Sequence, residues 1–102
     1  MESYIQYAAG YSKENINHND IKKAILDIQK MDDEHGAFWI SVITDFENVL
    51  EIDKSLTITA IFNPDTDNGT KYEAKDWQEV ESFLLLLIEG KFEDIKRRIN
   101  KN

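Results

Sequence analysis

One segment of the sequence, residues 38–44, constrains the fold more than any other. It reads Phe-Trp-Ile-Ser-Val-Ile-Thr, and such a run of aromatic and β-branched residues is typical of a strand. Successive side chains of a strand point to opposite faces of the sheet. Three apolar residues therefore share one face and the residues between them share the other: Phe38, Ile40 and Val42 against Trp39, Ser41 and Ile43. We predict a strand with a core side and a second, mixed side.

Two more strand-like segments follow, Val49–Asp53 and Leu56–Phe62. Only two residues separate them, which favours a hairpin. Alternation assigns apolar residues of both segments to the core side: Leu50, Ile52, Leu56, Ile58, Ala60 and Phe62. The opposite side receives Val49, Glu51, Asp53, Thr57, Thr59 and Ile61. Residues 3–9 predict a first strand, residues 12–19 a loop, and Thr70–Ala74 a short last strand.

Two helices are predicted from apolar residues that recur at three- and four-residue spacing. The first is capped by Asn19 or Asp20 and runs through Asp32, and Asp76 caps the second. Beyond Gly90, a basic terminal segment continues the helical spacing. The expected fold class is α+β: a mainly antiparallel sheet of four to five strands, with an N-terminal-half helix and a C-terminal helix packed on one face. A length of 102 residues suits a single domain over 1–102.

The charge of the chain limits its partners. Twenty acidic residues stand against twelve basic ones, for a net charge of −8. Nucleic acids and anionic membranes attract basic surfaces, so neither is an expected partner. The longest apolar run, residues 83–88, is too short to span a bilayer, and the first residues lack the basic and apolar regions of a signal peptide. The expected location is the cytoplasm, and the expected partner is a basic protein.

Much of the negative charge is concentrated in residues 31–53, which contain seven acids and no Lys or Arg. These acids are Asp32, Asp33, Glu34, Asp45, Glu47, Glu51 and Asp53. Solvated loops and strand faces account for such a segment equally well. The mixed side of the sheet combines Trp39 with Glu51 and Asp53, however, and an aromatic residue among carboxylates on a rigid sheet is typical of a binding surface. The alternative is that Trp39 packs under a loop or under the first strand.

Residues suited to catalysis are few. The chain contains no cysteine, and its two histidines, His18 and His35, lie in polar segments. His35 follows three acids, but adjacent loop residues seldom converge on one metal ion. The segment 63–74 has the wrong residues at the glycine and glutamate positions of a calcium loop. We therefore predict a protein that is not an enzyme and needs no cofactor or metal.

The overall pattern resembles the small immunity proteins of bacterial contact-dependent and polymorphic toxin systems. The resemblance is carried by the helix Ile21–Met31, the run Ala37–Val42, the strand pair around Val49–Ile52 and the closing segment Asp76–Glu81. It implies that the partner is a cognate toxin C-terminal domain, commonly a nuclease with a basic cleft. An immunity protein would neutralise that toxin by covering the cleft.

The residues predicted to contact the partner are Asp32, Asp33, Glu34, Trp39, Asp45, Glu47, Glu51 and Asp53. Because they do not all fit on one face, only a subset is expected to make contact. The chain is expected to be a monomer or a weak homodimer. Two alternatives remain: a non-catalytic adaptor or homodimeric subunit of a bacterial assembly, and a small hydrolase that uses carboxylates with His35.

Overall fold

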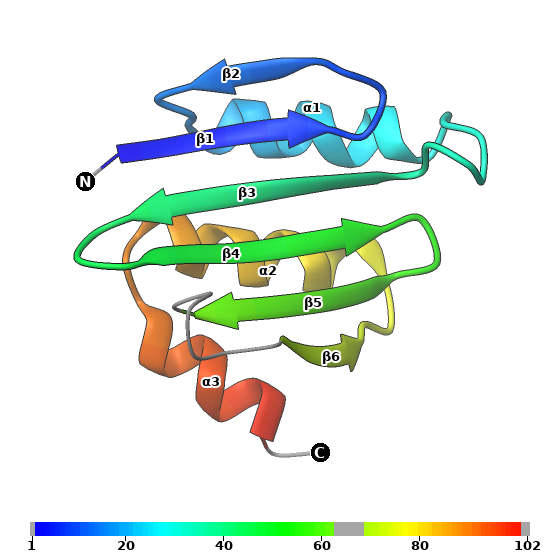
Figure 1. Cartoon of the computed structure of the whole chain (residues 1–102). Helices are drawn as coiled ribbons and strands as arrows, with labels where there is room; N and C mark the ends of the chain where they lie inside the picture. The colour runs from blue at the N-terminus through cyan, green and yellow to red at the C-terminus, as the bar shows by residue number, and fades with distance from the viewer. Residues whose placement is uncertain (1, 63–68, 101–102) are drawn as a thin grey trace.

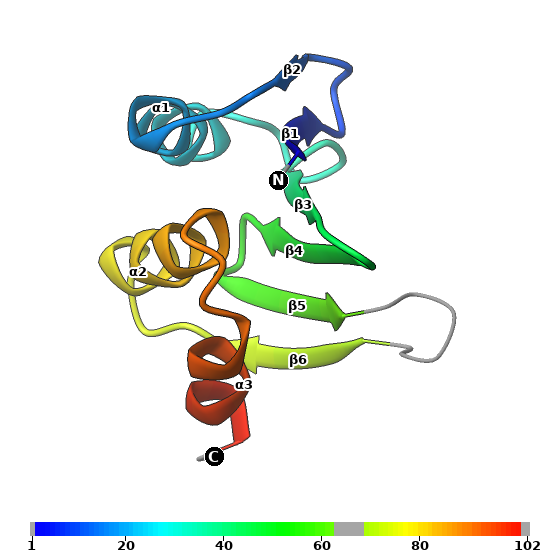
Figure 2. The ribbon, with the colours of Figure 1, turned by 90° about the vertical axis from the view of Figure 1, so that its left-hand side faces the viewer.

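The computed structural model describes residues 2–62 and 69–100 and has the α+β architecture that the sequence predicts. A six-stranded antiparallel sheet runs in the order β2-β1-β3-β4-β5-β6, and the three helices of the described residues lie on one side of it (Figures 1 and 2). The strands are β1 (Glu2–Tyr7), β2 (Ser12–Glu14), β3 (Ala37–Ile43), β4 (Glu47–Asp53), β5 (Thr57–Phe62) and β6 (Thr70–Glu73). The helices are α1 (His18–Ile28), α2 (Trp77–Ile88) and α3 (Phe92–Asn100).

The core lies between the sheet and the helices, as side-chain alternation predicts. Phe38, Ile40 and Val42 of β3 point to the helix side and are almost completely buried. The same holds for inward residues of β4 and β5 and for one stripe of each long helix: Leu50, Ile52, Ile58, Ala60, Ile21, Ala24, Ile25, Ile28, Val80, Phe83, Leu84 and Leu87. Leu56 and Phe62, also predicted to face the core, are partly buried and pack against it.

The first helix begins and ends earlier than its sequence predicts. The N-cap is Asn17, whose side chain accepts a hydrogen bond from the Asp20 backbone N–H at 3.2 Å. The Asp20 carboxylate in turn accepts one from the Asn17 backbone N–H at 2.9 Å, which completes a capping box. The helix ends at Ile28 rather than Asp32. Residues 32–34 consequently lie in the loop that leads to β3.

A strand is present where the sequence predicted only a loop. Ser12–Glu14 forms β2, which pairs antiparallel with β1 and lies at one edge of the sheet. All its residues are exposed, so no apolar alternation marks it in the sequence. Lys13 binds the Asp20 carboxylate at 2.8 Å, which ties this edge strand to α1.

A polar cluster joins the first strand to the first helix. The Tyr7 hydroxyl donates a hydrogen bond to Asp27 at 2.7 Å, and Lys23 lies 2.7 Å from the same carboxylate. The hydrogen bonds from Lys23 and Tyr7 lower the pKa of Asp27 below that of an ordinary aspartate. Burial and the neighbouring Asp27 carboxylate raise the pKa of Tyr7 above its usual range. The ionised form of Asp27 therefore stabilises the fold.

We expect this cluster to make stability depend on acid pH. Below a pH of about 4 the unfolded chain binds a proton at Asp27 that the folded chain does not, so the free energy of unfolding falls as the pH falls. We therefore expect the free energy of unfolding to fall less between pH 7 and pH 3 in Asp27→Asn than in the parent chain, as measured by urea unfolding at both pH values. Asp33→Asn, in an exposed loop, is the control and should retain the parental loss. An equal loss in Asp27→Asn and the parent would contradict this assignment.

Candidate protein-binding surface

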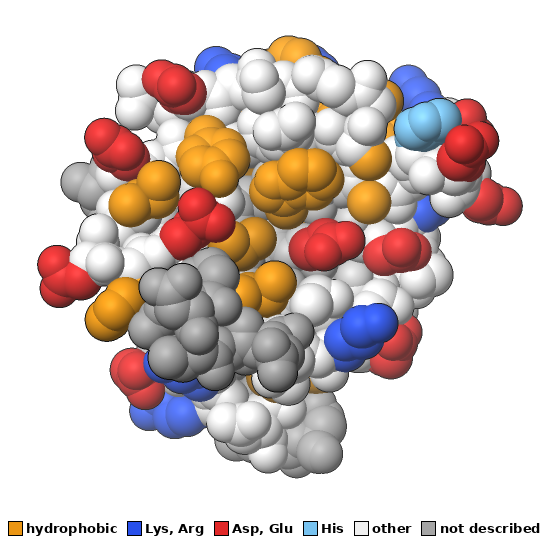
Figure 3. Space-filling model, in the orientation of Figure 1, with side chains coloured by type: hydrophobic (Ala, Val, Ile, Leu, Met, Phe, Trp, Pro, Cys, Tyr) orange, Lys and Arg blue, Asp and Glu red, His pale blue; other side chains and the backbone are white. Residues whose placement is uncertain are grey.

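The side of the sheet that faces away from the helices is here called the open face. Within the described residues, no helix covers it, and Figure 3 views it directly. Its centre is apolar: Tyr4 of β1, Trp39 and Ile43 of β3, Val49 of β4 and Ile61 of β5, here called the apolar patch. Acidic side chains lie against these apolar groups in Figure 3. The open face thus combines apolar contact area with negative charge.

Strand register fixes which groups are neighbours on this face. Trp39 lies directly between Gln6 of β1 and Glu51 of β4. Ser41 lies between Tyr4 and Val49. Directly opposite residues of an antiparallel pair have Cβ atoms about 5 Å apart, so a bound group can touch both side chains at once. Trp39 is half-buried, and its neighbour on the first strand is Gln6.

The eight predicted contact residues fall into three groups. Trp39 and the three acids of β4, Glu47, Glu51 and Asp53, lie on the open face. The acids Asp32, Asp33 and Glu34 lie in the α1–β3 loop at one end of the sheet. That end also holds Asp53, because the Lys54 backbone N–H donates to the Gly36 carbonyl at 2.8 Å. Asp45 lies in the β3–β4 turn, at the other end of β4.

The three acids that β4 contributes to the open face, here called the β4 acids, differ in their partners. Glu47 accepts a long hydrogen bond from the Tyr4 hydroxyl at 3.5 Å. Asp53 accepts from the Ser55 backbone N–H at 2.8 Å and from its hydroxyl at 2.7 Å. Glu51 is exposed, and its carboxylate has no hydrogen bond or ion pair with any other described residue. None of the three is paired with a cation of the described chain, so their charges are available to a cationic partner.

Sequence reasoning placed Ser41 on the open face but missed its importance. The residue is 0% exposed, and its hydroxyl has no hydrogen-bond partner within residues 2–62 and 69–100. It lies on the open side of β3, with Trp39 and Ile43 as its nearest neighbours on the same strand face. A buried hydroxyl without a partner is costly. The only available signal was a single polar residue inside an otherwise apolar strand.

The helix side carries a second apolar surface that the sequence did not predict. A groove of about 290 Å³ runs between α1 and α2 and is lined by Lys22, Ile25, Leu26, Trp77, Gln78 and Glu81. Leu26 is 62% exposed at its rim. Trp77, the first residue of α2, is only partly buried here. The two tryptophans therefore lie on opposite sides of the sheet.

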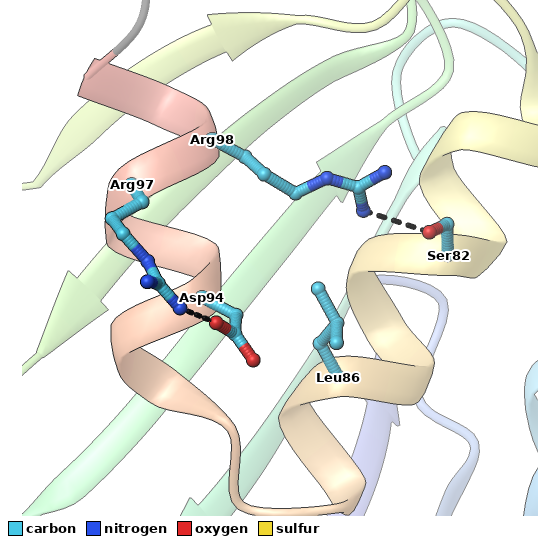
Figure 4. A pocket seen from close by; sticks show the side chains of 5 residues that line it. All are labelled: Ser82, Leu86, Asp94, Arg97 and Arg98. Atoms are coloured by element: carbon cyan, nitrogen blue, oxygen red, sulfur yellow. Dashed lines mark hydrogen bonds and ion pairs between the residues drawn. The ribbon is translucent and has the colours of Figure 1, made fainter.

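A hollow between α2 and α3 has more polar walls (Figure 4). It measures about 450 Å³ and is lined by Ser82, Leu86, Asp94, Arg97 and Arg98. Arg98 donates to the Ser82 hydroxyl at 2.7 Å, and Arg97 pairs with Asp94. These polar groups already bind one another, and Ser82 has an arginine rather than a base as its partner. The arrangement therefore offers no activated nucleophile.

The alternative of a hydrolase based on His35 finds one element of support. His35 Nδ1 lies 3.2 Å from the Asp32 carboxylate, at the rim of an open hollow. The other residues lining it are Ala8, Ala9, Lys30 and Met31. This set has no hydroxyl or thiol for the histidine to activate. Within the described chain, no group of three or more His, Asp or Glu residues is placed to bind a metal ion.

Comparison with protein-family profiles, with curated protein sequences and with solved structures gave no significant match for this chain. Among the described residues, none of the helices has the length and apolar character needed to cross a membrane.

Proposed function

We propose that this chain is a cytoplasmic, non-catalytic immunity protein that binds a cognate toxin domain through its open face. The observation that carries the proposal is the juxtaposition of Trp39 with Glu51, a carboxylate that has no partner in the described chain. Rigid aromatic anchors dominate the energy of many protein interfaces. Complementary charge accelerates association and selects the partner. The partner is accordingly a basic domain, most simply a nuclease whose cleft binds nucleic acid.

Inhibition would follow from occupation of the cleft. The β4 acids would meet cations that otherwise bind phosphate groups, and the apolar patch would exclude water from the contact. Substrate would then be excluded by both volume and charge. No bond needs to be made or broken in this process, which is consistent with the small number of candidate catalytic groups.

The direct test is co-purification with the C-terminal domain of the protein encoded by the neighbouring open reading frame. We expect a one-to-one complex with a basic domain that is toxic when it is expressed alone. Co-expression of this chain should restore growth. If that domain is neither toxic nor bound, the immunity function is wrong.

The adaptor or homodimer alternative is favoured by one observation, the groove between α1 and α2. Lys22 and Glu81 border this groove, and Leu26 projects beside it. In a dimer with a two-fold axis through this surface, Leu26 of each copy would meet the groove of the other. Sedimentation of the purified chain, with Leu26→Lys as the comparison, distinguishes this association from binding through the open face.

A further inference from the structure

We propose that the open face recognises an arginine side chain of its partner, held between the indole ring of Trp39 and the carboxylate of Glu51. This inference rests on the proposed function and specifies the chemistry of the partner. It also assigns the centre of the interface to one pair of residues.

Strand register provides the geometry. Trp39 and Glu51 are directly opposite each other on β3 and β4 and point to the same face. An arginine that enters this face can lay its planar guanidinium on the indole ring and donate two hydrogen bonds to the carboxylate. Lysine presents a compact ammonium group that does not make the same combination of contacts. The pair therefore selects arginine over lysine, and not positive charge alone.

The free state of Glu51 supports this assignment. Its carboxylate is exposed and lacks any hydrogen bond or ion pair within the described chain. The residue of β5 opposite Glu51 is Thr59. The cation Lys71 lies one strand further, on β6, opposite Thr59. The nearest cation in the strand register is thus two strands away from Glu51. Among the described residues the Glu51 charge is unpaired, so binding of a cation breaks no ion pair between them.

Ser41 supplies a second, independent observation. Its hydroxyl lacks a partner although the side chain is fully buried. Ser41 follows Trp39 by two residues on the same face and is a diagonal neighbour of Glu51, within reach of a long side chain. A guanidinium carries five N–H donors, of which the carboxylate uses two. Donation of a third N–H to the Ser41 hydroxyl requires the side chains that bury it to move on binding.

On one side the pair adjoins the apolar patch. Tyr4 and Val49 flank Ser41, and Ile43 continues the apolar patch along β3. Apolar neighbours exclude water, and charge-assisted hydrogen bonds are stronger where water is excluded. The arginine site therefore lies at the Trp39 end of the patch, in the row Gln6–Trp39–Glu51–Thr59, whereas Glu47 lies at the opposite end beside Ile43.

The test uses the placement of the two tryptophans on opposite sides of the sheet. In Trp77→Phe, Trp39 is the only tryptophan, so its fluorescence reports on the open face. This variant is titrated with a tetra-arginine amide and with a tetra-lysine amide at low salt. We expect tetra-arginine to bind about fivefold more tightly than tetra-lysine and to change the Trp39 emission. In Trp39→Phe, the remaining Trp77 should not respond.

Glu51→Gln in the Trp77→Phe background should abolish the preference for arginine. The matched control is Glu89→Gln, which removes an exposed acid at the end of α2 and should retain that preference. Equal affinities for the two peptides would overturn the arginine site. So would a preference that survives Glu51→Gln.

The same reagents separate this inference from the proposed function. Selective peptide binding without capture of a toxin domain would support the arginine site and count against immunity. Capture of a toxin domain together with equal binding of the two peptides would overturn the arginine site and leave the immunity function standing.

Discussion

Reversing the charge of the three β4 acids should weaken binding of a basic partner about a hundredfold. The variant combines Glu47→Lys, Glu51→Lys and Asp53→Lys. Each substitution replaces a favourable interaction at the interface by a repulsive one, and about 1 kcal/mol for each position gives a total of roughly 3 kcal/mol. Most of the change should appear as slower association, and it should shrink as salt is raised. Stopped-flow kinetics with the captured toxin domain at two salt concentrations provides the measurement.

A control must reproduce the change in net charge elsewhere on the molecule. The substitutions Glu81→Lys, Glu89→Lys and Glu93→Lys do so on α2 and α3, on the helix side of the sheet. This control should slow association only modestly, because it changes the long-range field but not the contact. If both triple variants bind alike, the open face is not the interface, even if the chain neutralises a toxin.

The largest effect on stability should come from the centre of the core. Phe38 on β3 is 0% exposed, and its ring lies 6.1 Å from that of Tyr7. Phe38→Ala removes a large buried ring from between the sheet and the helices, and we expect a loss of about 4 kcal/mol in the free energy of unfolding. The free energy of unfolding of a domain of this size is typically about 5–15 kcal/mol, so the variant would lose a large part of its stability. Urea denaturation followed by circular dichroism measures the difference.

The chain offers a matched control in the adjoining turn. Phe46 is 55% exposed between β3 and β4, so Phe46→Ala should change stability by less than about 0.5 kcal/mol. Comparable losses in the two variants would mean that the sheet does not bury Phe38 in this way. A small loss in Phe38→Ala alone would lead to the same conclusion.

Side-chain periodicity predicted the sheet faces well, because burial on one side forces alternation. Phe38, Ile40 and Val42 face the core as expected, and Trp39 faces away from it. No alternation marks β2, because it is a short and wholly exposed edge strand. The predicted start of α1 was also inexact. Several polar residues in a row are suitable caps there, and only the observed hydrogen bonds identify Asn17.

The candidate site could be predicted only within a single strand. Glu47, Glu51 and Asp53 have a spacing that sends them to one face. Which of them lies opposite Trp39 depends on the β3–β4 register, which the turn determines, and in this register it is Glu51. The acids of residues 32–34 and Asp45 belong to connections at opposite ends of the sheet, and sequence gives no distance between connections. Whether the Ser41 hydroxyl has a hydrogen-bond partner likewise depends on neighbours from two other strands.

The two edge strands also affect the tendency of the protein to aggregate. An open sheet ends in unpaired backbone groups, which can recruit further strands and lead to fibrous aggregates. Here β2 has three residues, of which Lys13 and Glu14 are charged, and β6 has four, of which Lys71 and Glu73 are charged. Short, charged edges give an incoming strand little to pair with. The protein can therefore keep an apolar surface uncovered, ready for a partner, without stacking copies of itself edge to edge.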